Sequence, residues 1–159
     1  MRGIQVRARG VFVLALLALV TLATAHAQDR YRVRYLASSD GATANTIVNP
    51  ELVDPWGLAF DPYGFAYVAA PGSGRVVRLD GAGVSKPPSI SVSISAWGEQ
   101  APIALTFNGS ENFHTYRYGG GNGPSRMLIT TERGSLHGWN PDVDPDHAVS
   151  VYQSTMDML

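Results

Sequence analysis

The sequence of 159 residues contains no cysteine. Disulfide bonds, thiol catalysis, zinc–thiolate sites and thiol-based redox switching are therefore excluded. Small secreted domains often depend on disulfide bonds, and this chain has to rely on packing, bound ions or association with other chains instead. Charged residues are also scarce, at 16% of the chain, and Lys86 is its single lysine.

A long membrane-spanning run is also missing. The segment Val11–Ala25 is apolar and uncharged, but its roughly 15 residues fall short of the roughly 20 that a transmembrane helix needs. The only charged residues before this segment are basic. Ala25-His26-Ala27 at its end has the small-x-small pattern of a signal-peptidase site. This order predicts a signal peptide over residues 1–27, with cleavage between Ala27 and Gln28 and a secreted or periplasmic product. The alternative is an uncleaved membrane anchor.

Removal of residues 1–27 leaves 132 residues, enough for one small domain with a core. Three of the twelve basic residues lie in the signal segment, so nine remain against thirteen acidic residues. The resulting charge near −4 gives no indication of a nucleic-acid partner, and no membrane span is expected after cleavage.

Sustained helical periodicity is absent from the predicted mature chain. Short β-branched or aromatic runs alternate instead with turns rich in glycine, proline and aspartate, a pattern typical of all-β domains. Asp61-Pro62-Tyr63-Gly64 has the composition of a type I turn and predicts a hairpin between its two flanking runs. The predicted strands are Val33–Ala37, Gly57–Phe60, Phe65–Ala69, Arg75–Leu79, Ser91–Ser95, Ala104–Phe107, Met127–Thr131 and Ser135–Trp139.

The chain contains an internal repeat with a period of 47 residues, which aligns Pro55 with Pro102. Each copy consists of a proline, two strands, a glycine turn and a third strand. The second copy carries an insertion, residues 108–125. Within it, the glycine-rich stretch Tyr116–Gly123 favours a disordered loop over a glycan- or partner-binding loop. A period in the forties with several strands per unit is typical of β-propeller blades. The alternative is a β-sandwich containing two unrelated hairpins.

At these residues the chain resembles an uncharacterised family of exported bacterial β-propeller proteins with NHL-like repeats, some of which end in a PEP-CTERM sorting tail. The resemblance spans most of residues 36–141 and is most specific at Pro55-Trp56-Gly57. It departs from the family pattern at Ala69-Ala70-Pro71 and at Arg133. The resemblance implies export and a propeller fold, but no activity.

A closed propeller needs about four or more blades of roughly 40–50 residues each. The predicted mature domain, residues 28–159, holds only about two to three. We therefore expect an all-β, partial β-propeller, incomplete at its C-terminus, that follows an N-terminal signal-peptide helix. Such a fragment would leave blade edges open for self-association.

Two groups of residues could carry chemistry. Asp142, Asp144 and Asp146 alternate and could present oxygen atoms to Ca²⁺, although Pro145 favours a solvated acidic loop. Polar residues beside the repeated strands could line a propeller channel and bind a metal or polar ligand, and turn capping is the alternative for them. These residues are Asp54, Asn108 and Glu132.

No catalytic residue can be named. The histidines lack zinc-ligand spacing and no serine lies in a Gly-x-Ser-x-Gly elbow. The tryptophans are expected to pack in the core or between blades, and a role as ligand platforms is the alternative. They are Trp56, Trp97 and Trp139. The sequence thus favours a non-catalytic binding or structural module without a cofactor. The alternative is a Ca²⁺-dependent propeller hydrolase or lactonase.

Overall fold

The computed structural model describes residues 32–94, 98–99 and 101–153. The predicted signal peptide with its Ala27–Gln28 cleavage site, and Trp97, lie outside these ranges. The chain divides into two units, residues 1–34 and 35–159, and every strand of the described residues lies in the second. The described part of the chain contains no helix with the length and hydrophobicity needed to cross a membrane.

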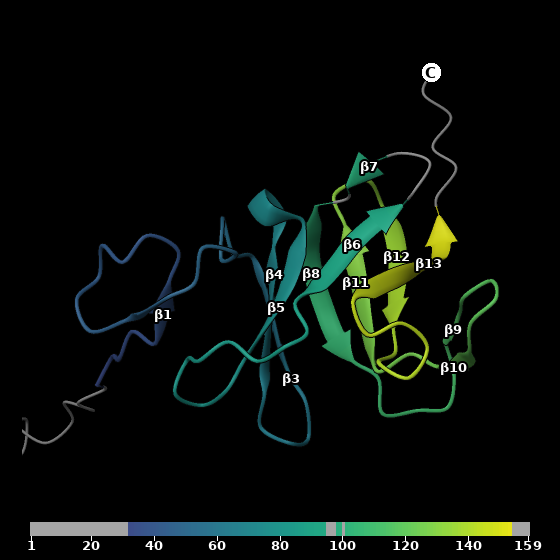
Figure 1. Ribbon diagram of the computed structural model, residues 1–159, viewed down its shortest axis with the longest axis horizontal. Helices are drawn as coiled ribbons and strands as arrows, with labels where there is room; N and C mark the ends of the chain where they lie inside the picture. The colour runs from purple at the N-terminus through teal and green to yellow at the C-terminus, as the bar shows by residue number, and fades with distance from the viewer. Residues whose placement is uncertain (1–31, 95–97, 100, 154–159) are drawn as a thin grey trace, which may run out of the picture. The chain divides into compact units, whose positions relative to one another are not determined.

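The second unit is all-β, as predicted, and eight of its strands form one barrel-like sheet (Figure 1). Their order is β3-β4-β5-β6-β13-β12-β11-β8, with β7 paired to β6. The bounds are β3 Gly57–Phe60, β4 Ala66–Ala70, β5 Arg75–Leu79, β6 Ile90–Ile94, β7 Gly98–Glu99, β8 Pro102–Phe107, β11 Met127–Thr131, β12 Ser135–Trp139 and β13 His147–Gln153.

The two copies of the sequence repeat fold as two equivalent antiparallel meanders. The first copy forms β3-β4-β5 and the second β8-β11-β12. Each meander gains a fourth strand on the same side, β6 beside β5 and β13 beside β12. The two four-stranded units then join through the parallel pair β6–β13. One eight-stranded sheet therefore replaces the separate sheets of a β-sandwich.

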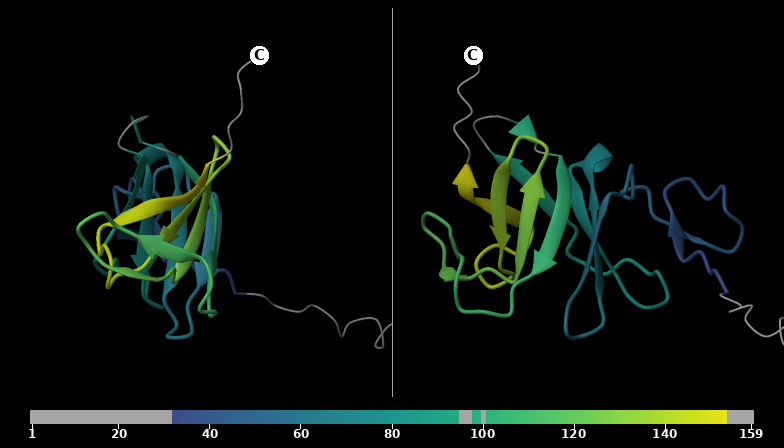
Figure 2. Two further views of the ribbon diagram at one scale, coloured as in Figure 1. Left: turned by 90° about the vertical axis from the view of Figure 1, so that its right-hand side faces the viewer. Right: turned by 180° about the vertical axis from the view of Figure 1, so that it is seen from behind.

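The sheet almost closes where β3 lies beside β8 (Figure 2, right view). Gly57 makes this approach possible, because a Cβ atom there would lie 2.8 Å from the Ile103 carbonyl oxygen and 2.9 Å from the Ala104 Cα. The glycine of the Pro55-Trp56-Gly57 motif thus has a packing role.

Successive side chains of each strand point to opposite faces of the sheet, so one set of apolar residues lies in the barrel interior. Val76, Ile90 and Val92 of the first four-stranded half of the sheet meet Met127, Ile129 and Trp139 of the second half. A smaller cluster forms on the outer face of the first half, where Leu52 covers Val77 and Leu79. The segment that carries Leu52 also contains the parallel pair β1 (Ala37–Ser38) and β2 (Ile47–Val48).

Three sequence predictions about local structure are wrong. The strand expected over Val33–Ala37 is limited to Ala37–Ser38, because no described strand pairs with the preceding residues. The insertion at residues 108–125 folds into a hairpin of β9 (His114–Tyr116) and β10 (Asn122–Pro124). Trp56 is 63% exposed because it precedes β3 on the outer side of the barrel.

Candidate functional site

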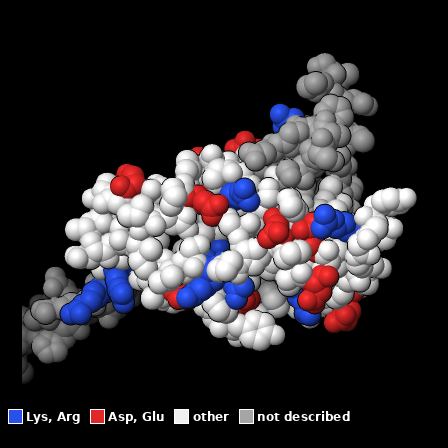
Figure 3. All heavy atoms as spheres, in the orientation of Figure 1, with Lys and Arg blue, Asp and Glu red and all other residues white. Residues whose placement is uncertain are grey.

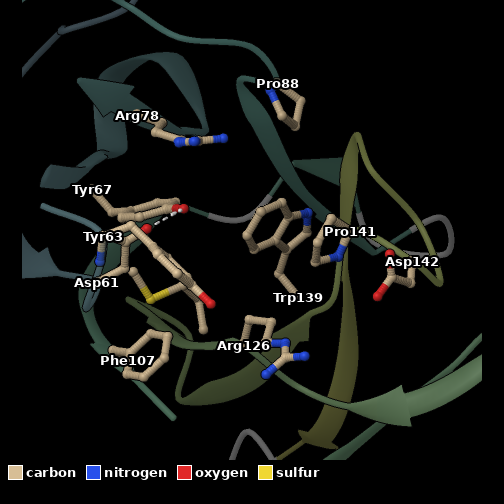
Figure 4. A pocket seen from close by; sticks show the side chains of 11 residues that line it. Asp61, Tyr63, Tyr67, Arg78, Pro88, Phe107, Arg126, Trp139, Pro141 and Asp142 are labelled. Atoms are coloured by element: carbon tan, nitrogen blue, oxygen red, sulfur yellow. Dashed lines mark hydrogen bonds between the residues drawn. The ribbon is translucent and has the colours of Figure 1, made fainter. Parts of the chain in front are cut away.

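A pocket of about 270 Å³ lies at one end of the barrel, where β3, β5, β8 and β12 end and β4 and β11 begin (Figure 4). The antiparallel meanders bring these strand ends together although they are distant in sequence. Four aromatic side chains line the pocket, together with two prolines, Met127 and four charged side chains. The aromatic residues are Tyr63, Tyr67, Phe107 and Trp139.

The pairing register of the strands determines where the deeper aromatic residues of the pocket lie. Trp139 and Phe107 both pair with Met127 across β12, β11 and β8, so the three side chains occupy one level of the sheet. Tyr67 on β4 meets Trp139 at 6.1 Å between ring centroids and an interplanar angle of 54°. The Trp139 indole N–H donates to the Pro145 carbonyl at 3.0 Å, which fixes the ring at the base of the pocket.

Asp61 supports the aromatic wall from the turn between β3 and β4. One carboxylate oxygen accepts the backbone N–H groups of Tyr63 and Phe65, each at 2.9 Å. The other accepts the Tyr67 hydroxyl at 3.3 Å. Burial raises the pKa of Tyr67 to about 12; the Arg78 charge opposes this rise, and the Asp61 carboxylate adds to it. Tyr67 is therefore a protonated donor, and Asp61 is occupied with holding the turn.

Two arginines supply positive charge on opposite sides of the pocket (Figure 4). Arg78 stacks over the Phe65 ring at 3.9 Å and donates weakly to the Pro87 carbonyl at 3.4 Å. Its buried Nε atom has no hydrogen-bond partner among the described residues. Arg126 is exposed at the rim. Among the described residues, no carboxylate lies within 4 Å of either guanidinium, so both cations are available to a ligand.

The predicted ligand set of Asp54, Asn108 and Glu132 is not brought together. Asn108 follows the end of β8, whereas the Glu132 N–H donates to the Ala101 carbonyl just before that strand begins. Six residues of strand separate them by about 20 Å. Asp54 precedes β3, at the same end of the sheet as Glu132.

Asn108 instead caps a turn, which was the alternative to channel lining in the sequence analysis. Its amide donates to the carbonyls of Asn112 and Ser125, each at 2.9 Å, and its oxygen accepts from Ser110. The repeat aligns Asn108 with Asp61, which caps its own turn in the same way. Of this aligned pair, only Asp61 reaches the pocket.

The three alternating aspartates also have separate positions. Asp142 is exposed and lines the pocket, Asp146 is exposed, and Asp144 is buried. Asp144 forms an ion pair with Arg117 at 2.8 Å and accepts three hydrogen bonds from Asp146 and His147. Burial opposes its ionisation, but these partners outweigh burial and lower its pKa. Within the described ranges, no three His, Cys, Asp or Glu side chains are grouped to hold a metal ion.

A second polar group is buried at the other end of the barrel. His137 is completely buried, and its Nε2 atom lies 3.0 Å from the Ser135 hydroxyl, which in turn lies 2.6 Å from that of Thr131. Burial lowers the pKa of His137, and a hydrogen bond to the Ala148 backbone offsets part of this shift. These buried groups hold the second meander together without access to a substrate.

Of the pocket residues, sequence reasoning had named only Asp142 as a candidate ligand residue, and for a calcium site that the structure does not assemble from the described residues. Arg78 carried a usable signal, because it shares a strand face with the core residue Val76 and is therefore a charged residue in an inward register. Arg126 and Tyr63 carried none, since they belong to connections whose path is set by strand pairing. Trp139 was expected in the core and is buried there, but its role as the base of a pocket depends on the neighbouring strands.

The chain matches no known family profile. No solved structure matches it. Among curated proteins it is similar to an uncharacterised protein of Acanthamoeba polyphaga mimivirus, with 30% identity over 118 residues. The match covers 72% of this chain but only 28% of the viral protein, so the chain spans little more than a quarter of this relative's length. The relative carries no assigned activity, and its viral source gives no support to the bacterial family that the motifs resemble.

Proposed function

We propose that this protein is an exported, non-catalytic binding module related to β-propeller proteins, with its ligand site in the pocket at the barrel end. The observation that carries this proposal is the pocket itself. It combines an aromatic wall with two arginines that lack carboxylate partners among the described residues. Apolar walls with a few converging polar groups are typical of small-molecule sites.

Binding accounts for these groups better than catalysis does. General acid–base chemistry needs a group whose pKa lies near the working pH. In the pocket, the Asp61 oxygens are engaged in the turn, and burial moves the pKa of Tyr67 further from neutrality. No observation on the described residues favours the calcium-dependent hydrolase.

The propeller relationship is supported by the two four-stranded meanders. A propeller blade is also a four-stranded antiparallel sheet, and the 47-residue period of the repeat falls within the usual blade lengths. In this proposal each meander corresponds to one blade, and the β6–β13 pair joins the two.

Export rests on the charge and hydrophobicity of residues 1–27. The test is the N-terminal mass of protein recovered from the periplasm or medium of a secreting host. Processing at Ala27 gives a chain that begins at Gln28, whereas exported protein that retains residues 1–27 contradicts the proposal.

The proposal includes self-association through the outer side of β3. Trp56, Leu58 and Phe60 are exposed at alternate positions along this strand and form an apolar stripe. Exposed apolar patches of this kind are typical of protein interfaces. The stripe lies at the edge of the hydrogen-bonded sheet and carries no charge, so a second copy of the same stripe would suit it. On the face of the molecule that Figure 3 shows, acidic and basic side chains are interspersed.

The ligand site can be tested with a screen of small neutral, cationic and anionic ring compounds by ligand-observed NMR. We expect binding that weakens several-fold in Tyr63→Ala, because this exposed ring lines the pocket. Tyr118→Ala is the matched control, since Tyr118 is an exposed tyrosine in the connection between β9 and β10. Failure of every compound class to bind, or equal binding by the Tyr63 variant, contradicts the proposal.

A further inference from the structure

We propose that the ligand of the pocket is a small carboxylate whose carboxyl group is attached to a ring with an apolar face. This inference rests on the proposed binding function and specifies its ligand. The relevant chemistry is shared by aromatic carboxylates and by sugar acids, both of which present a flat apolar surface and a carboxylate.

The charge of the ligand follows from the two arginines. The guanidinium of Arg78 is oriented by its stacking on Phe65, and its hydrogen bond to the Pro87 carbonyl is long at 3.4 Å. Arg78 lines the pocket, and a carboxylate accepts hydrogen bonds from a guanidinium in a planar, two-pronged geometry. Arg126 adds a second positive charge at the rim.

The two acidic groups of the pocket do not neutralise these cations. The Asp61 oxygens accept hydrogen bonds from the turn and from Tyr67. Asp142 lies at the far side of Trp139 and Pro141, and its carboxylate points away from Arg78 (Figure 4). The positive charge of the two arginines therefore favours a ligand that carries a negative charge.

The ring requirement follows from the walls. Tyr67 and Trp139 lie between the two arginines, with Phe107 and Tyr63 nearby (Figure 4). Such surfaces stack against the face of an aromatic ring or the apolar face of a sugar. At about 270 Å³ the pocket lies below the size typical of drug-sized ligands, so one ring with its substituents fits it better than an extended chain.

The inference can be tested with two matched pairs of probes on the full chain. Benzoate is compared with its neutral analogue benzamide, and galacturonate with galactose. The readout is the dissociation constant from titration of the Trp139 indole N–H signal, which is assigned with Trp139→Phe. We expect at least one carboxylate to bind about tenfold more tightly than its neutral partner, since a hydrogen bond to a charged group strengthens binding by about this factor or more. The pair that shows the preference identifies the ligand as aromatic or sugar-derived.

Variants connect this preference to the arginines. Arg126→Gln removes an exposed charge and is expected to fold normally while losing most of the preference. Arg78→Lys keeps the charge but not the planar donor pair, and we expect it to weaken carboxylate binding with little effect on the neutral analogue. Arg133→Gln is the charge-matched control, because Arg133 is exposed in the β11–β12 turn at the other end of the barrel.

Equal binding of carboxylates and neutral analogues overturns the inference and leaves the proposed binding function standing. A carboxylate preference that survives in both Arg126→Gln and Arg78→Lys also overturns it, because the charge would then be recognised elsewhere. If neither carboxylate binds, the inference is wrong, and the compound screen decides separately whether the pocket binds any ligand.

Discussion

At the scale of single residues, identical side chains have different roles because the sheet gives them different surroundings. Trp56 and Trp139 differ in this way, with 63% and 3% of their surfaces exposed. Trp56 precedes β3 and is exposed, whereas Trp139 ends β12, donates to the Pro145 carbonyl and contacts Tyr67 inside the barrel.

Truncation of the two tryptophans should therefore have unequal effects. We expect Trp139→Ala to lower the free energy of unfolding by about 3–5 kcal/mol, as is usual for a buried tryptophan. Trp56→Ala should change it by less than about 0.5 kcal/mol, as is usual for surface positions. Urea unfolding at low protein concentration measures both. Equal losses in the two variants would place Trp56 in the core and contradict the fold described here.

His137 should make the protein sensitive to mild acid. Burial lowers its pKa in the folded state below the ordinary value of about 6.5, so the unfolded chain binds the proton first as the pH falls. The free energy of unfolding should therefore decrease below about pH 6.5, by at most about 1.4 kcal/mol per pH unit from this group.

The pH dependence can be measured by urea unfolding between pH 7.5 and pH 5. We expect His137→Asn to be less stable at pH 7.5 but to lose less stability on acidification than the unmodified chain. His114→Asn is the control, because His114 is exposed on β9. If the pH dependence of the free energy of unfolding is unchanged in His137→Asn but reduced in His114→Asn, the acid sensitivity comes from His114 and the prediction is wrong.

At the scale of elements, the barrel depends on a contact that involves no strand hydrogen bonds. β3 and β8 begin the two repeats and approach each other at Gly57, where the backbone of β8 fills the space of a side chain. The conformational freedom of glycine is not required there, but its lack of a Cβ atom is.

Gly57→Ala should consequently separate the two strands. The atoms it would meet belong to the backbone at Ile103 and Ala104, which cannot rotate away, so we expect a loss of about 1–3 kcal/mol in the free energy of unfolding. Gly81→Ala is the matched control, because no atom lies within 4 Å of the Cβ position at Gly81. Hydrogen exchange should also accelerate in β3 more than in β12. Equal stability of the two variants would show that β3 and β8 are not in close contact.

At the scale of the whole molecule, the apolar stripe on β3 sets the expected behaviour in solution. Its side chains are open to solvent, while the corresponding outer face of β5 is covered by Leu52. Removal of such a surface from water favours association.

We expect the purified chain to form dimers or larger species as its concentration rises. Combined replacement of Trp56 and Phe60 by serine should shift the population toward monomer without loss of folded structure, because both side chains are exposed. Light scattering coupled to size-exclusion chromatography measures the mass, and Tyr118→Ser provides the control on the β9–β10 connection. A monomer at all concentrations would rule out self-association through the stripe.

The sequence by itself determined the all-β class and most strand positions. β5, β11 and β12 have the predicted bounds, because alternation and turn residues are local properties of the chain. The repeat was also visible, and it corresponds to the two meanders. The insertion was misjudged, because its glycine content concealed a hairpin held by Asn108, Ser125 and Thr115.

Only the tertiary structure decided where the functional groups meet. The pocket joins the ends of six strands from both repeats, and that arrangement depends on the β6–β13 pairing and on the contact at Gly57. These are long-range contacts, and no local pattern encodes them. Asp61 and Asn108 are equivalent in the repeat and cap equivalent turns, yet only Asp61 faces the pocket. The sequence identifies both residues as turn formers, and packing between the two meanders determines which of them can contact a ligand.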